Sequence, residues 1–172
     1  VLRQTTARLP WLLIGMLGGI GNSMILGNFD TTFAAHPEMA LYIPLIGGTG
    51  GNVGTQSSAL VVQGLANSSL DANNTWKQIL KESIVALINA TIISMLVYVY
   101  NFIRFGATAT VSYSVSLSLF AVVMFASIFG TLVPMTLEKL KIDPAIATGP
   151  FISITNDIIG MMLYMGITVL LS

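Results

Sequence analysis

The chain has 172 residues, of which 54% are hydrophobic and 8% are charged, and its formal net charge is zero. A soluble domain carries roughly 25% charged residues, so we expect most of the outer surface to face lipid. The zero net charge argues against a nucleic-acid partner. The chain contains no Cys and one His, which excludes disulfides, thiolate metal sites and a His-cluster metal site within one chain.

Five apolar segments are long enough to cross a bilayer, which takes about 20 residues of α-helix. The second is interrupted by Pro44 and several glycines, and Asp143 with Pro144 has the form of an N-cap and first turn for the fifth. We therefore predict an all-α, multi-pass protein of the cell membrane with five transmembrane helices. The expected helices span residues 9–27, 38–66, 77–102, 111–137 and 144–171.

Basic residues predict the orientation of these helices. If the five helices alternate in direction, six of the seven Lys and Arg residues fall on one side of the membrane, and Arg104 falls on the other. Positive residues favour the cytoplasm, so we predict that the N-terminus is inside the cell and the C-terminus outside. The six residues are Arg3, Arg8, Lys77, Lys81, Lys139 and Lys141.

Asp157 is the one ionisable residue deep inside an apolar segment, and it is the fourteenth residue of the expected fifth helix. A carboxylate near the bilayer centre is costly, and such residues usually face a cavity, a partner or an ion path. Small and polar residues recur around it at offsets of three and four, which predicts one shared helix face. The alternative is a protonated Asp157 bonded to a neighbouring helix. The recurring residues are Gly149, Ser153, Asn156 and Gly160.

The second expected helix carries five glycines within residues 47–54. In a membrane, small residues let helices approach closely, and irregular backbone is tolerated where it lines a cavity. Asn52 and Thr55 fall on one face of this helix together with Gly48 and Gly51. The pattern therefore favours a pore wall, and the alternative is a tight packing face without an ion path.

The expected pore offers oxygen ligands for a hard cation. Asn52 and Asp157 lie roughly 20 Å from opposite ends of the membrane, so we predict that they meet near its midplane. Mg²⁺ prefers oxygen and retains several waters, with Mn²⁺, Co²⁺ and Ca²⁺ as alternatives in the same site. One Asp neutralises half of a divalent charge, so we predict a homodimer in which paired Asp157 residues bind a hydrated ion. The predicted ligands are Asp157, Asn52, Ser153, Asn156 and Thr55.

Other functions remain open for the same residues. A carrier coupled to H⁺ or Na⁺ could bind a proton at Asp157, because desolvation raises the pKa of a carboxylate. A membrane enzyme needs a second catalytic group at matching depth, and the acids Glu82 and Glu138 lie near the surface instead. We therefore predict that the protein is not an enzyme. Glu82 follows Lys81, which favours an interfacial ion pair over a regulatory cation site.

These segments together resemble the transmembrane domain of the MgtE family of Mg²⁺ channels, over nearly the whole chain, in order and in spacing. The Arg8-Leu-Pro-Trp11 start of the first helix is also similar to that family. The residues that carry the resemblance are Pro44 with Gly48-Thr-Gly-Gly-Asn-Val-Gly-Thr-Gln56, then Leu80-Lys-Glu82, Asp143-Pro-Ala145, and Gly149-Pro-Phe with Asn156-Asp157.

The resemblance implies a five-helix homodimer whose second and fifth helices line the pore. It implies that Asp157 binds Mg²⁺ through its water shell, with contributions from Asn52 and the carbonyl near Ser153. Known members are gated by a cytoplasmic N-terminal domain and paired CBS domains. Nothing in residues 1–172 resembles those domains, so we expect this chain to be the pore domain of a longer protein. Some members carry Asn where this chain has Gly149, and selectivity is expected to differ accordingly.

Overall fold

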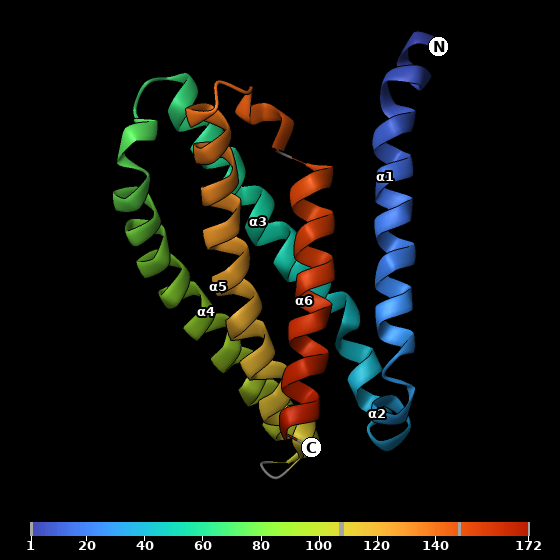
Figure 1. Ribbon diagram of the computed structural model, residues 1–172. Helices are drawn as coiled ribbons and strands as arrows, with labels where there is room; N and C mark the ends of the chain where they lie inside the picture. Colours follow the sequence, from blue (N-terminus) through green and yellow to red (C-terminus); the bar gives the residue numbers. More distant parts are fainter. Residues whose placement is uncertain (1, 107–108, 148, 172) are drawn as a thin grey trace.

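The structure is a computed structural model that describes residues 2–106, 109–147 and 149–171, and within these ranges it is all-helical without strands (Figure 1). Four of the described helices are long and apolar enough to cross a membrane. This confirms the all-α prediction, and the four candidate spans agree with a multi-pass membrane protein. The four helices are α1 (Leu2–Gly27), α4 (Thr75–Phe105), α5 (Thr110–Lys139) and α6 (Pro150–Leu171).

A fifth long helix, α3 (Ile43–Ala66), has 24 residues but does not share the apolar character of the other four. Its glycines and polar side chains lower its hydropathy. At 1.5 Å per residue it is roughly 36 Å long, which is enough to cross a bilayer. Helix α3 therefore stays a predicted fifth membrane span, and it needs its polar face to be covered away from lipid.

Three helix starts differ from the sequence prediction by five residues or more, and the first helix begins at Leu2 instead of residue 9. The second long helix begins at Ile43 instead of residue 38, because Pro37–Tyr42 form a 3-10 helix, η1, and Pro44 lies in the first turn of α3. The glycines of α3 do not interrupt it. The last helix begins at Pro150 instead of Pro144, because η3 (Pro144–Ala147) precedes it and Gly149 has a φ of +96°. The two other short elements are α2 (Asp30–Ala35) and η2 (Ala72–Asn74).

The long helices run alternately up and down, and α1 lies on the outer side of the bundle next to α6 (Figure 1). The N-terminus of α1, the start of α4 and the end of α5 lie at one end of the molecule, and the C-terminus lies at the other. Arg3, Lys77, Lys81 and Lys139 belong to the first end, whereas Arg104 belongs to the second. The side chain of Arg8 lies outside the described part of the chain.

Helix α5 is the centre of the bundle and has the largest share of buried residues among the four apolar helices. Serines on α5 bond to its neighbours: Ser94 of α4 donates to the carbonyl of Ser116 at 2.7 Å, and the hydroxyls of Ser114 and Thr168 of α6 lie 2.8 Å apart. These bonds satisfy polar groups that lipid cannot satisfy. They fix α5 against α4 and α6.

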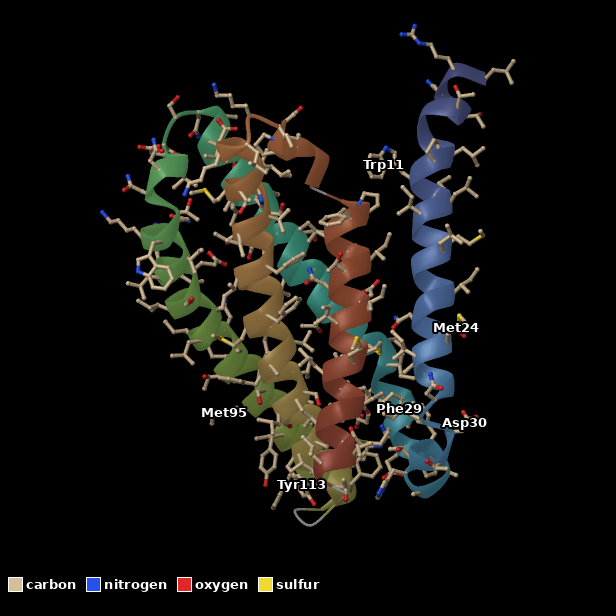
Figure 2. The ribbon with its side chains drawn as sticks, in the orientation of Figure 1. Trp11, Met24, Phe29, Asp30, Met95 and Tyr113 are labelled. Carbon is tan, nitrogen blue, oxygen red and sulfur yellow. The ribbon has the colours of Figure 1, made fainter. Side chains whose placement is uncertain are left out.

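The outer helices present apolar side chains to their surroundings, as expected for a protein in lipid. Met95 on α4 is 62% exposed, and Trp11 lies on the side of α1 that faces α6 (Figure 2). None of the apolar span of α1 is buried within the chain. Gly18 of α1 lies against α6, and its missing side chain leaves room for Ile154.

Candidate metal-ion site

An open groove of about 610 Å³ lies between α3 and α6, with one residue contributed by α1. It combines a carboxylate, amides, hydroxyls and glycine backbone in one place, whereas the larger faces of the helices are apolar. Seven of the eight residues predicted from the sequence as ligands or pore-lining glycines line this groove. The lining residues are Asn22, Ile43, Gly47, Gly48, Gly51, Asn52, Thr55, Gly149, Pro150, Ser153, Asp157 and Met161.

The glycines of α3 leave the space that Asp157 occupies. A methyl group on Gly51 would lie 3.5 Å from Oδ1 of Asp157 and 3.3 Å from Oγ of Ser153, and a methyl on Gly47 would lie 3.6 Å from the same carboxylate oxygen. Any larger side chain would fill the gap between the two helices. The glycine-rich face therefore makes room for the acid and for whatever the acid binds.

Asp157 is half-buried, and its carboxylate makes no hydrogen bond or ion pair with any described residue. Ser153 lies one turn before it, so the two side chains share one helix face. A carboxylate held in an apolar bundle without a partner is costly. This arrangement fits a group whose partner is a cation or its water shell, and it disfavours the alternative of an Asp bonded to a neighbouring helix.

Asn52 and Thr55 bring amide and hydroxyl oxygens to the opposite wall. The side chain of Asn52 is exposed in the groove, and no described residue hydrogen-bonds it. The hydroxyl of Thr55 donates to the carbonyl of Gly51 at 2.8 Å. Its proton is therefore committed, and the oxygen keeps lone pairs that can accept from a water or meet a cation.

Gly149 shapes the end of the groove at the start of α6. Its carbonyl accepts the backbone N–H of Ser153 at 3.0 Å and so begins the helix, while its φ of +96° lies in the region that favours glycine. No atom lies within 4 Å of the position where its Cβ would be. Gly48 also faces open space. Both glycines keep the groove wide where they line it.

Asn156 is the predicted ligand that the structure does not bring to the groove. It is 1% exposed, and its amide packs where a Cβ on Gly54 would overlap its Nδ2. Gly160, expected on the same face, instead lies 3.6 Å from Val122 of α5, measured from its would-be Cβ. Each residue turns the helix by about 100°, so Ser153 and Asp157 face the groove. Asn156 instead faces Gly54 of α3.

Asn22 of α1 is a groove residue that the sequence analysis missed. Its Oδ1 is buried and has no hydrogen-bond partner among the described residues. The available signal was Asn22 itself, which is the one amide side chain within the apolar residues 9–27 and is followed by Ser23. Only the packing of α1 against α6 shows which groove that amide reaches.

The described residues contain no group of three or more His, Cys, Asp or Glu side chains that could hold a metal ion. One carboxylate with several neutral oxygens is a poor site for a dehydrated divalent ion, which needs more negative charge. It suits a cation that keeps most of its waters, as Mg²⁺ does.

Glu82 does not form the expected ion pair with Lys81. Its carboxylate instead accepts hydrogen bonds from the hydroxyls of Ser57 on α3, at 2.9 Å, and of Ser127 on α5. The two serines are themselves 3.1 Å apart. Glu82 therefore joins three helices, because a carboxylate between buried hydroxyls is better satisfied than one beside a flexible surface ammonium.

Comparison with known proteins places these features in a family. The family model MgtE, described as a divalent cation transporter, matches residues 43–167. The chain is 33% identical over 160 residues to the magnesium transporter MgtE of Bacillus subtilis and 33% identical over 165 residues to that of Thermus thermophilus. These alignments cover 93% and 96% of the chain but only 35% and 36% of the relatives, so it spans about a third of their length.

Proposed function

Because the chain belongs to the MgtE family of divalent cation transporters, we propose that it forms a channel that conducts Mg²⁺ into the cell. One observation carries this proposal: the Asp157 carboxylate, without a partner among the described residues, faces a polar groove opposite the glycine-rich helix α3. The relatives are named as magnesium transporters, and the oxygen atoms that Asp157, Asn52, Thr55 and Ser153 bring to the groove are the ligand type that Mg²⁺ prefers.

In the proposed mechanism the ion passes with most of its water shell. Asp157 attracts the cation, while Asn52, Thr55 and Ser153 hold the surrounding waters through neutral oxygens. A weak, hydrated site favours conduction, because an ion must also leave. Inward movement needs no ATP, since a divalent ion gains about 4.6 kcal/mol per 100 mV of inside-negative potential.

We propose a homodimer in which two grooves face each other. The groove of one chain is open on one side and holds one carboxylate, which neutralises half of a divalent charge. A second copy would close the path and bring a second Asp157 to it. In this assembly α3 is a fifth membrane span covered on its polar face, the N-terminus is cytoplasmic, and the longer protein carries its regulatory domain on that side.

The experiment that tests the proposal is Mg²⁺ uptake into proteoliposomes by Asp157→Asn. The matched control is Asp30→Asn, which removes an equal charge from an exposed residue of α2, away from the groove. We expect Asp157→Asn to slow uptake by about tenfold or more, the equivalent of losing about 1.4 kcal/mol of ion attraction, and Asp30→Asn to leave it unchanged. A folded Asp157→Asn protein that transports Mg²⁺ at the wild-type rate would overturn the proposal.

A carrier coupled to H⁺ or Na⁺ is the second candidate, and the observation that favours it is the same unpartnered acid, which could bind a proton. Planar-bilayer recordings separate the two. Discrete unitary Mg²⁺ currents support the channel. Slow flux that stops when the H⁺ or Na⁺ gradient is removed supports the carrier.

A further inference from the structure

A second groove, of about 560 Å³, lies at the end of the bundle where α3 ends and α4 begins. It is separate in sequence from the Asp157 groove, since all its lining residues fall within 68–84. Ser68 shapes the turn with a φ of +58°. The groove combines two ammonium groups, hydroxyls and two amides at one side with aliphatic side chains at the other.

The polar side of this groove has excess positive charge. Lys77 and Lys81 are both exposed, lie one turn apart on α4, and form no ion pair with any described residue. Asp71 also lines the groove, but its Oδ1 accepts the backbone N–H of Asn73 at 2.9 Å and caps η2. Two cations and one anion leave the groove with a net charge of +1, which attracts an anionic ligand.

The apolar side continues along α4 toward the middle of the helix. Leu80 is 56% exposed and Ile84 is 57% exposed, and Ile84 lies roughly 10 Å along the helix axis from Lys77. Trp76, 78% exposed at the start of the same helix, is of the type that lies at the headgroup level of a bilayer. The groove is therefore polar at the membrane surface and apolar toward the membrane interior.

We propose that this groove binds an anionic phospholipid. Its phosphate is held by Lys77 and Lys81, and its acyl chain lies along Leu80 and Ile84. A free phosphate would leave the aliphatic side unused, and an acidic protein segment would not be drawn to exposed aliphatic side chains that face lipid. In a phospholipid the charged headgroup would meet the polar side of the groove, and the acyl chain would meet the aliphatic side.

Native mass spectrometry of the full chain, released from detergent with added phosphatidylglycerol or phosphatidylcholine, tests this proposal. Each lysine near an anionic headgroup contributes about 1 kcal/mol, so Lys77→Gln with Lys81→Gln is expected to weaken phosphatidylglycerol binding about 30-fold. The matched control is Lys139→Gln with Lys141→Gln, which removes the same charge at and just after the end of α5. The end of α5 and the start of α4 lie at the same end of the bundle (Figure 1). We expect the control to retain the lipid.

Several results would overturn the proposal. If both double variants lose phosphatidylglycerol equally, the attraction is a general effect of positive charge at this end of the bundle. If the wild-type chain retains phosphatidylglycerol and phosphatidylcholine equally, the groove does not recognise the charge of the headgroup. Displacement of the lipid by millimolar inorganic phosphate would indicate a free-phosphate site. Unchanged binding by Ile84→Ser would show that the acyl chain does not lie along Ile84. Lipid-independent protection of Lys77 and Lys81 from acetylation would indicate a protein ligand. Size-exclusion profiles that match wild type show that the variants are folded.

Discussion

Gly130→Ala probes a close backbone contact between helices α5 and α3. A Cβ on Gly130 of α5 would lie 2.5 Å from the carbonyl oxygen of Gly54 on α3. That oxygen belongs to helix backbone and cannot rotate away. The alanine therefore requires the two helices to separate.

The size of the effect follows from this distance. Carbon and oxygen approach to about 3.3 Å, so the helices must part by about 0.8 Å. A gap of that size forfeits a quarter to a half of the dispersion attraction across the contact. Overpacking costs about 1–3 kcal/mol, and alanine in place of glycine in a helix returns up to about 1 kcal/mol. We expect a net loss of about 2 kcal/mol, which lowers the unfolding temperature by about 4–8 °C for a chain of this size.

Thermal unfolding in detergent micelles, followed by size-exclusion chromatography of heated samples, measures this change. Gly48→Ala is the matched control, since Gly48 lies on α3, the helix that Gly130 contacts, and no atom lies within 4 Å of its would-be Cβ. The control should unfold at or slightly above the wild-type temperature. If Gly130→Ala is as stable as Gly48→Ala, the close crossing of α3 and α5 is not present in the protein.

Two further substitutions test local features by the same thermal assay. Gly149→Ala should lower the free energy of unfolding by about 1 kcal/mol, because the φ of +96° disfavours a Cβ even though no atom would clash with it. Gly149→Asn should lower it less, since Asn tolerates positive φ better. If both variants are as stable as wild type, residue 149 does not have a positive φ in the protein. Glu82→Ala should lower the free energy of unfolding by about 1 kcal/mol, because it removes the hydrogen-bond acceptor shared by Ser57 and Ser127. Glu82→Gln keeps an acceptor oxygen and should restore most of this loss, and an alanine variant as stable as wild type would show that the three-helix junction contributes nothing.

The sequence by itself determined that the protein is a helical membrane protein and which segments form its long helices. Hydropathy over about 20 residues is a local property, and it does not depend on how helices pack. The helix ends were predicted less well. Residues 38–42 and 144–147 form 3-10 turns, because proline and a positive-φ glycine, Gly149, separate them from the regular helices that follow.

The candidate site was predicted as a set of residues but not as a surface. A lone Asp in an apolar segment and a run of glycines identify Asp157 and α3 from composition alone. Which neighbours of Asp157 reach the groove depends on the rotation of α6 about its own axis. That rotation is set by packing, with Asn156 fitted against Gly54 and Gly160 against Val122.

Only the tertiary structure decided how distant residues meet. It brought Asn22 of α1 to the groove of α3 and α6, and it joined Glu82 to two serines instead of to the adjacent Lys81. The physical reason is the same in both cases. A polar side chain in a membrane bundle bonds to whichever helix the packing brings within reach, and that helix cannot be read from spacing along the chain.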